Sequence, residues 1–242
     1  MGLTYRVIFL RVFQINDFSG NVSRMLCDQN MINPKKVLVL APHTDDAELG
    51  CGGTIARLLE EGVDVHIAVF STAEESLPSG VPHGTLKDEF YSAMAVMQIP
   101  LANLTVHDYP VRRLSYHRQE VLESLIDLRA KVKPETVLLP AGSDLHQDHQ
   151  VVNVEGLRAF KDITVWGYEL PWNHVEFSAN AFVVLNESQL QKKWLALQSY
   201  KTQLELSRSY FTWDFVQSLA RVRGVQVKTA YAEAFEVIRI RL

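Results

Sequence analysis

The sequence predicts an α/β fold, a Rossmann-like three-layer sandwich with a mostly parallel sheet covered by helices on both faces. Short apolar segments of strand length alternate along the chain with longer segments whose apolar residues recur every three to four positions. The segment 37–41 (Val-Leu-Val-Leu-Ala) is apolar throughout. Such a run is typical of a strand buried on both faces, as in a parallel sheet.

We expect a single domain over residues 36–242, preceded by an N-terminal extension over residues 1–35. A chain of 242 residues suits one α/β core. The apolar stretch in residues 5–13 is far shorter than the roughly 18 to 20 residues that span a bilayer, so no membrane span is expected. Four interpretations of the extension stay open: an extra edge strand, a contact between copies of the chain, a poorly ordered leader, or a start closer to Met31.

The elements are predicted in order from periodicity and end signals. A helix over 47–61 follows the first strand and ends at Gly62, a residue that suits a helix end. A later helix begins at Asn186, where Gln189 completes a capping box. The periodic residues of this helix span 190–204. The remaining expected strands are 63–71, 104–107, 136–140, 165–170 and 181–185, and the remaining helices are 89–97 and 121–132.

Two polar clusters each follow a predicted strand. Residues 42–50 (Pro-His-Thr-Asp-Asp-Ala-Glu-Leu-Gly) come after the first strand, and residues 146–149 (His-Gln-Asp-His) come after the strand at 136–140. The carboxyl ends of parallel strands meet at one edge of a sheet, where open α/β sheets place their ligand crevice. The two clusters are therefore expected to form one site.

The residue types in these clusters indicate a metal site. Imidazole nitrogen and carboxylate oxygen are donors that a catalytic zinc takes, with three protein ligands and one position left for water. A tight turn brings His43 and Asp46 round one point, and His149 supplies a third donor from another strand end. Asp45 is then a carboxylate that does not bind the metal. Zinc lowers the pKa of its bound water to about 7, and a neighbouring carboxylate such as Asp45 can accept the proton of that water. The alternative, that Asp45 and Asp46 only cap the following helix, explains neither His43 nor the second cluster.

The same residues carry a family resemblance. The segment 42–54 resembles the first signature of the PIG-L/LmbE-like deacetylases, and residues 146–149 resemble the second. The resemblance extends from about Lys36 to near the C-terminus and includes residues 231–235 (Tyr-Ala-Glu-Ala-Phe). It implies a hydrolase that removes N-acetyl groups from glucosamine-containing molecules with a single zinc ion.

The resemblance also implies a role for each of six residues. It assigns metal ligation to His43, Asp46 and His149, general base catalysis to Asp45, stabilisation of the oxyanion or protonation of the amine to His146, and orientation of His146 to Asp148.

One departure concerns substrate recognition. The family commonly carries an arginine that contacts substrate near the start of the helix at 89–97, where this chain has Leu86 and Lys87. Lys87 replaces the charge but not the planar two-pronged geometry of a guanidinium.

Three other segments each have a functional and a structural interpretation. The glycine-rich segment 50–53 lacks the spacing of a dinucleotide loop and is expected to allow close packing of helix on sheet. The loop 71–85 is either a mobile cover over the site or an ordinary surface loop. Trp172 and its neighbours Asn173 and His174 either contact a sugar ring or pack at the rim.

Composition argues against binding to nucleic acid or anionic lipid and favours a cytoplasmic location. The formal net charge is −4, and no long block of Lys and Arg provides a local attraction to nucleic acid or anionic lipid. The two cysteines, Cys27 and Cys51, are too few for a disulfide framework, which favours a reducing cytoplasm. Cys51 is expected to pack against neighbouring residues rather than to bind metal.

The predicted function is zinc-dependent removal of the N-acetyl group from an N-acetylated amino sugar or its conjugate, which releases acetate and a free amine. Two alternatives are hydrolysis of another small amide by the same metal centre, and a ligand-binding α/β module with a structural metal. The expected partner is a small N-acetylated sugar, and assembly into a homo-oligomer is left open.

Overall fold

The computed structural model describes residues 34–241, and at their centre lies a seven-stranded sheet. Apart from its last two residues, the predicted extension at 1–35 lies outside the described residues. Within residues 34–241, no helix combines the length and the apolar character needed to span a membrane. The strands are β1 (Lys36–Ala41), β2 (Asp64–Val69), β3 (Leu104–Val106), β4 (Thr136–Pro140), β5 (Thr164–Tyr168), β6 (Ala181–Leu185) and β7 (Tyr231–Arg239).

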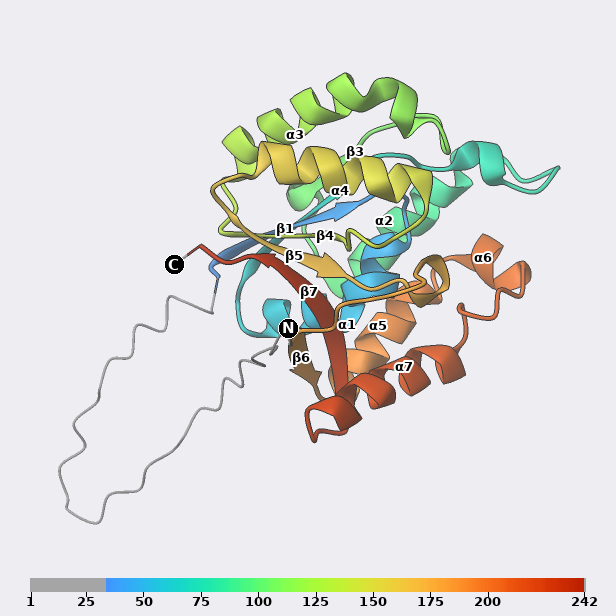
Figure 1. Cartoon of the computed structure of the whole chain (residues 1–242). Coiled ribbons are helices and arrows are strands. Elements are labelled where there is room, and N and C mark those ends of the chain that lie inside the picture. The colour runs from blue at the N-terminus through green and yellow to red at the C-terminus, as the bar shows by residue number, and fades with distance from the viewer. Residues whose placement is uncertain (1–33, 242) are drawn as a thin grey trace, which may run out of the picture. The chain divides into compact units, whose positions relative to one another are not determined.

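The strands lie in the order β3-β2-β1-β4-β5-β7-β6 (Figure 1). The first five strands of this order pair in parallel, and β7 is antiparallel to both β5 and β6. The order along the chain reverses between β1 and β4, which are neighbours in the sheet. Such a topological switch point is where ligands bind in open α/β sheets. Each polar cluster follows one of these two strands, so the fold brings both clusters to the switch point.

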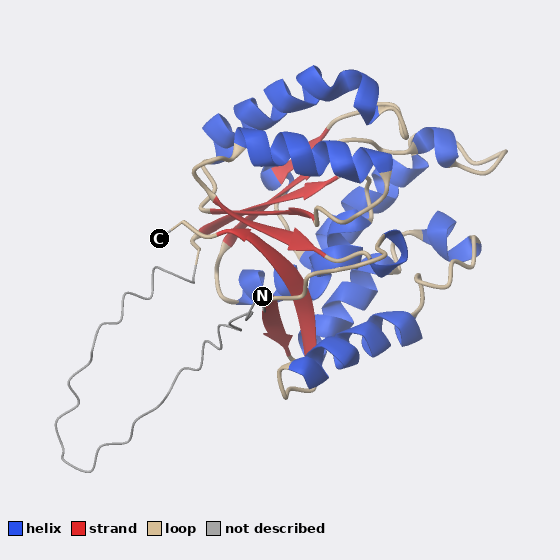
Figure 2. Ribbon diagram, in the orientation of Figure 1, coloured by secondary structure: helices blue, strands red, loops and turns tan. Residues whose placement is uncertain are grey.

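Helices cover both faces of the sheet, which confirms the predicted three-layer architecture (Figure 2). One face packs against α3 and α4, and the other packs against α1, α2, α5 and α7. Successive residues of β1 enter opposite cores, because Val37 and Val39 face one layer and Leu38 and Leu40 face the other. The helices are α1 (Asp46–Glu60), α2 (Thr85–Met97), α3 (Arg118–Val132), α4 (Gln147–Ala159), α5 (Glu187–Leu197), α6 (Lys201–Glu205) and α7 (Trp213–Gln226).

The structure differs from the sequence prediction in the last third of the chain. The helix expected over 190–204 is divided into α5 and α6, with Tyr200 in a non-helical conformation between them. The division is stabilised from α2, because the Glu89 carboxylate accepts from the backbone N–H and the hydroxyl of Thr202, at 2.9 and 2.6 Å. Helix α7 was not predicted, and β7 was noted only in part, as the family match at 231–235.

Helix α2 begins at Thr85, four residues before the predicted start. Glu74 explains the difference, since its buried carboxylate accepts from the backbone N–H groups of Gly84 and Lys87, at 2.9 and 3.1 Å. These bonds satisfy donors at the helix start that otherwise lack partners. They also fasten the loop 71–85 to α2.

The glycine-rich segment 50–53 packs closely, as predicted. A side chain at Gly50 would collide with the ring of Tyr168, and one at Gly53 would collide with Leu185. Cys51 is fully buried and its thiol donates to the Ala47 carbonyl at 3.3 Å, which agrees with a packing role. Helix α1 therefore lies directly against the sheet strands behind the candidate site.

Candidate metal centre and active site

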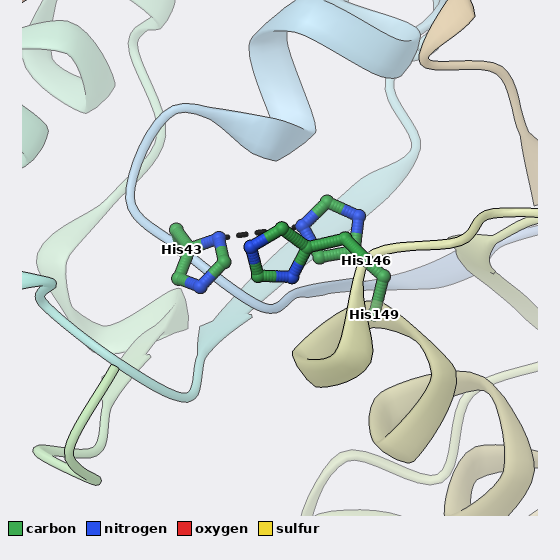
Figure 3. A group of neighbouring side chains, drawn as sticks. All are labelled: His43, His146 and His149. Atoms are coloured by element: carbon green, nitrogen blue, oxygen red, sulfur yellow. Dashed lines mark hydrogen bonds between the residues drawn. The ribbon is translucent and has the colours of Figure 1, made fainter. Parts of the chain in front are cut away.

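Three histidine rings converge at the switch point (Figure 3). His43 lies in the loop between β1 and α1, whereas His146 and His149 lie at the start of α4. One nitrogen of each ring lies within 4.8 Å of the others, and the ring centroids of His146 and His149 are 4.5 Å apart. Two loops more than a hundred residues apart in sequence thus meet in one cluster.

A tighter set of donors lies within this cluster. His43 Nδ1 is 3.1 Å from Asp46 Oδ2, and His149 Nε2 is 3.3 Å from each of these two atoms. Around a tetrahedral zinc with bonds of about 2.0 to 2.2 Å, neighbouring ligand atoms are separated by roughly 3.3 to 3.5 Å. The spacing of these three atoms therefore fits a tetrahedral metal ion. The backbone N–H of His43 also donates to Asp46 Oδ2, at 2.8 Å, and holds that carboxylate in place.

Each of the two metal-facing histidines contacts a carboxylate on its other side. Asp148 Oδ2 is 3.0 Å from His43 Nε2, and Asp144 Oδ2 is 2.7 Å from His149 Nδ1. A carboxylate in this position holds the ring proton on the outer nitrogen, which leaves the lone pair of the inner nitrogen for a metal. Sequence analysis did not identify Asp144. Its signal was an acid two residues before His146, in the loop between β4 and α4.

The carboxylate of Asp148 does not orient His146, contrary to the role that the family resemblance implied. The backbone N–H groups of Arg112 and Leu114 donate to this carboxylate at 2.6 and 3.2 Å and hold it beside His43 instead. Arg112 adopts a left-handed backbone conformation, with φ of 65°, to present its N–H there.

His146 is oriented by backbone groups. Its Nδ1 accepts from the backbone N–H of Asp148 at 3.2 Å, and its own backbone N–H donates to Asp144 Oδ1 at 2.8 Å. A neutral ring that accepts at Nδ1 carries its proton at Nε2. His146 is therefore a hydrogen-bond donor through Nε2.

The carboxylates make the cluster a favourable place for positive charge. Burial alone would lower the pKa of His43 and His149, but Asp148 raises the pKa of His43 to about 9, and Asp46 raises that of His149 to about 10. His146 behaves oppositely, because burial and the two neighbouring rings lower its pKa to about 4. His43 and His149 thus attract either protons or a metal cation, whereas His146 stays neutral at pH 7.

Asp45 is next to these donors and is partly exposed. It occupies the position before α1, yet its side chain makes no capping hydrogen bond. The capping interpretation therefore does not account for Asp45. Burial and the charge of Asp46 raise the pKa of the Asp45 carboxyl to about 6.

Tyr200 stabilises the loop between β1 and α1. Its buried hydroxyl lies 2.6 Å from the Thr44 carbonyl oxygen and 2.7 Å from Glu48 Oε1. Burial raises the pKa of the Glu48 carboxyl to about 8. Apolar periodicity in the sequence reports only burial and could not reveal this hydroxyl contact.

The comparison with known families agrees with this geometry. Residues 38–160 match the family model described as PIG-L, GlcNAc-PI de-N-acetylase. The matched segment contains both polar clusters. The chain belongs to the PIG-L family.

Curated relatives of this PIG-L family chain include two deacetylases. It is 25% identical over 175 residues to the uncharacterised deacetylase YaiS of Escherichia coli, which covers 69% of the chain and 91% of the relative. It is 29% identical over 134 residues to the diacetylchitobiose deacetylase of Thermococcus kodakarensis, with 52% of the chain and 49% of the relative covered. A third relative is 4-oxalmesaconate hydratase of Pseudomonas putida, 24% identical over 228 residues, with 83% and 84% covered.

Solved structures show the same fold. The N,N'-diacetylchitobiose deacetylase from Pyrococcus horikoshii superposes with a TM-score of 0.71 at 19% identity, covering 87% of this chain and 86% of that one. The zinc-inhibited form of teicoplanin deacetylase Orf2 superposes with a TM-score of 0.68 at 17% identity, covering 83% and 96%. The α/β architecture of this chain is thus that of PIG-L-type deacetylases.

Proposed function

We propose that this chain is a zinc-dependent hydrolase that removes the N-acetyl group from an N-acetylated amino sugar or its conjugate. The observation that carries the proposal is the convergence of His43 Nδ1, Asp46 Oδ2 and His149 Nε2 beside the uncapped carboxylate of Asp45. Membership of a deacetylase family supports the reaction type. A cytoplasmic location is part of the proposal, since the chain has only two cysteines.

The metal would be held by His43, Asp46 and His149. When bound, a zinc ion supplies a Lewis acid and lowers the pKa of a coordinated water to about 7. Asp148 and Asp144 keep the two imidazoles in the tautomers that present lone pairs to this point.

Asp45 is the proposed general base. Its carboxylate is not used in a helix cap, and its raised pKa of about 6 lies near the pH at which it must accept a proton. In the reaction, the oxygen of a water molecule forms a bond to the acetyl carbonyl carbon while Asp45 accepts the water proton. The carbon–nitrogen bond then breaks, and the amine leaves with that proton.

His146 is the proposed donor to the reacting carbonyl oxygen. Its neutral ring carries a proton at Nε2, because Nδ1 accepts from the backbone of Asp148. A donor fixed in advance at the place where negative charge develops stabilises the transition state. The role assigned to Asp148 in this proposal is to orient His43.

Hydration is a second candidate, favoured by the similarity to 4-oxalmesaconate hydratase over most of the chain. A hydratase adds water to a double bond and releases no acetate. Hydrolysis of another small amide is a third candidate. Two assays distinguish the three candidates. Acetate release is measured with N-acetylglucosamine, its conjugates and a non-sugar acetamide. Hydration is measured as the loss of the double bond of an unsaturated acid.

The first prediction separates metal binding from catalysis. Asp45→Asn is expected to keep the fold and one zinc per chain while turnover falls by roughly 10²-fold or more, the scale of a lost general base. Asp46→Asn is expected to weaken metal binding and turnover together, because a ligand both holds the ion and tunes its water.

Zinc content and acetate release are measured on the same preparations of both variants. Near-normal turnover in Asp45→Asn would remove Asp45 as the base and make His146 the candidate. His43→Ala and His149→Ala serve as matched ligand deletions, and undiminished zinc in both would remove them from the metal site.

A further inference from the structure

His174 joins two loops that follow the neighbouring strands β4 and β5. It lies directly after the short helix η5 (Pro171–Asn173), and its Nδ1 is 3.0 Å from the Ser143 hydroxyl in the loop between β4 and α4. On the other side of the ring, the backbone N–H of Leu170 donates to His174 Nε2 at 3.2 Å. Both ring nitrogens therefore have a partner. No step of the proposed reaction uses this histidine.

The two contacts specify where the ring carries its proton. A backbone N–H can only donate, so His174 Nε2 must offer its lone pair to Leu170. A neutral imidazole carries one proton, which then lies on Nδ1 and is donated to the hydroxyl oxygen of Ser143. The geometry thus selects the neutral Nδ1–H tautomer of His174.

The loop to which Ser143 belongs holds residues of the candidate site. Asp144, the next residue, contacts His149 Nδ1 at 2.7 Å and accepts from the backbone N–H of His146 at 2.8 Å. The first contact orients a proposed metal ligand, and the second orients the proposed donor to the reacting carbonyl. A displacement of this loop would therefore move both groups.

The segment after β5 is held on two sides. The ring of Trp172 stacks on the ring of Tyr210, with centroids 3.9 Å apart and an angle of 12° between the planes. Asn173 joins the segment to the other loop, because its side-chain amide donates to Asp144 at 3.3 Å and its carbonyl accepts from the backbone of Leu145 at 3.0 Å. These hydrogen bonds lie beside the histidine contact and depend on the same spacing between the two segments.

Protonation of His174 is incompatible with its two contacts. The imidazolium ring carries a proton on each nitrogen, so Nε2 would present an N–H to the N–H of Leu170. Leu170 is buried, and its N–H would be left without an acceptor, which is costly. Imidazole is the side chain that ordinarily changes charge between pH 5 and pH 8. The junction between the two loops therefore requires the neutral ring.

The charged groups around the junction do not stabilise a protonated ring. The segments that contact His174 or its partners carry five of them: Asp144, Glu169, Glu176, Arg223 and Glu236. Asp144 contacts His149, and Glu169 pairs with Arg223. That guanidinium lies 5.6 Å from the centre of the Phe177 ring, which packs against His174 with centroids 5.3 Å apart. Within residues 34–241, the hydrogen-bond partners of the His174 ring are two uncharged groups.

We propose that His174 is a positioning residue that works as a proton-sensitive latch. While its ring is neutral, it joins the segment after β5 to the loop that carries Asp144 and His146. Once the ring is protonated, the two segments separate and the alignment of His146 and His149 is lost. The effect on turnover rests on the proposed function, whereas the latch itself is a property of the fold. Acid thus switches the site off through a group that contacts neither substrate nor metal.

The proton position and the Leu170 hydrogen bond test the latch without any substrate. At pH 7.5, nitrogen NMR of the full chain is expected to show His174 as the Nδ1–H tautomer, with its signal assigned by its absence in His174→Gln. Protection of the Leu170 amide against hydrogen exchange, corrected for the intrinsic effect of pH, is expected to fall by about tenfold or more between pH 7.5 and pH 5.5.

His174→Gln is the informative variant for the exchange measurement. Its side-chain oxygen can accept from the Leu170 N–H and does not titrate, so the protection of Leu170 is expected to stay constant over the same pH range. An Nε2–H tautomer of His174, or equal protection of Leu170 at the two pH values in the wild type, would overturn the proposal.

The pH dependence of turnover tests the effect on the site, with acetate release from N-acetylglucosamine and from N,N'-diacetylchitobiose as the assay. The ratio of kcat at pH 5.5 to kcat at pH 7.5 is expected to be about fivefold higher in His174→Gln than in the wild type. Loss of zinc in acid affects both proteins alike, since they share every proposed metal ligand, and zinc content is measured on the same samples.

Two further variants accompany this comparison. Ser143→Ala opens the latch from the other loop and is expected to raise the same ratio by lowering kcat at pH 7.5. His83→Gln removes an exposed histidine from the loop 71–85 and, as the matched control, is expected to keep the wild-type ratio.

The outcomes separate the latch from the proposed function. Acetate release with the same ratio in the wild type and His174→Gln would overturn the latch and keep the hydrolase. An Nδ1–H tautomer with acid-dependent exchange at Leu170, but without acetate release, would keep the latch and reject the hydrolase.

Discussion

Asp144 holds the tautomer of His149, a proposed metal ligand, although Asp144 is not itself proposed to bind the metal. Its carboxylate contacts His149 Nδ1 and also receives hydrogen bonds from the backbone of His146 and the side chain of Asn173. One buried acid therefore links the imidazole, the proposed hydrogen-bond donor and the rim of the site. Such an outer carboxylate fixes the imidazole tautomer and strengthens its binding to metal.

The second prediction follows from this contact. Asp144→Asn is expected to weaken zinc binding by about 10- to 100-fold while the fold is kept, since the amide no longer stabilises the required tautomer as a carboxylate does. Zinc affinity is measured by competition with a chelator. Asp162→Asn, whose side chain is 67% exposed, is the matched control. Wild-type affinity in Asp144→Asn would show that this contact does not support metal binding.

The third prediction concerns the pH dependence of stability at His107. Its ring stacks on Phe70 with centroids 5.4 Å apart, and its Nε2 is buried without a hydrogen-bond partner in the described part of the chain. Burial lowers its pKa below the ordinary value of about 6.5. The unfolded chain thus takes up this proton before the folded chain does, so this contribution to stability is complete above about pH 6.5 and is lost as the pH falls.

His107→Phe removes the ionisable group and keeps an aromatic ring for the stack. Its urea midpoint is therefore expected to fall less than that of the wild type between pH 7 and pH 5. His83→Phe, at an exposed position, is the control and is expected to follow the wild-type profile. Parallel profiles of His107→Phe and the wild type would contradict the prediction.

At the scale of elements, helix α1 is interrupted by a buried ion pair. Cys51 is non-helical inside α1, with φ of −146°, and the bond expected between the Gly53 N–H and the Leu49 carbonyl is replaced. Lys193 of α5 donates to Leu49 O at 2.8 Å, and Glu233 of β7 accepts from Gly53 N at 3.0 Å. The two side chains pair with each other at 2.7 Å. The short first part of α1, which carries Asp46, is therefore held by groups from two other elements.

The fourth prediction tests this pair. Lys193→Met is expected to lower the free energy of unfolding by about 3 to 5 kcal/mol, because it leaves the Glu233 charge buried without its partner. Lys193→Met combined with Glu233→Gln is expected to cost less than the sum of the single variants. Urea unfolding gives all three values, with Lys192→Met as the neighbouring control. Additive effects would show that the two side chains are not coupled.

At the scale of the whole molecule, all proposed site residues and both hydrophobic cores lie within residues 34–241. We propose that residues 36–242 form a single catalytic domain, with 1–35 as an extension. The first core strand, β1, begins at Lys36, and every strand that surrounds the switch point follows it in the chain.

The fifth prediction is that deletion of residues 1–30 keeps one zinc per chain and turnover per folded molecule. The physical reason is that the elements that position both polar clusters are retained. Zinc content and acetate release are measured on the truncated and full-length chains, and light scattering reports any change in assembly. Loss of turnover with zinc still bound would show that the deleted segment completes the substrate pocket.

The sequence by itself determined the layered α/β class and the meeting of the two polar clusters. Both follow from local patterns: apolar runs such as residues 37–41 specify buried strands, and parallel strands necessarily bring their carboxyl ends to one edge. The capping box at Asn186 and Gln189 was likewise predicted from spacing alone and is present. Each of these features was predicted from a pattern of residues that are neighbours in the chain.

Only the tertiary structure decided which carboxylate faces which histidine. Asp148 is 105 residues from His43, yet it contacts that ring rather than its sequence neighbour His146, because backbone donors from the segment after β3 hold its carboxylate there. Glu233 reaches Gly53 across 180 residues in the same way. Chemically equivalent acids cannot be assigned by spacing, since the choice depends on how distant segments are oriented when they pack.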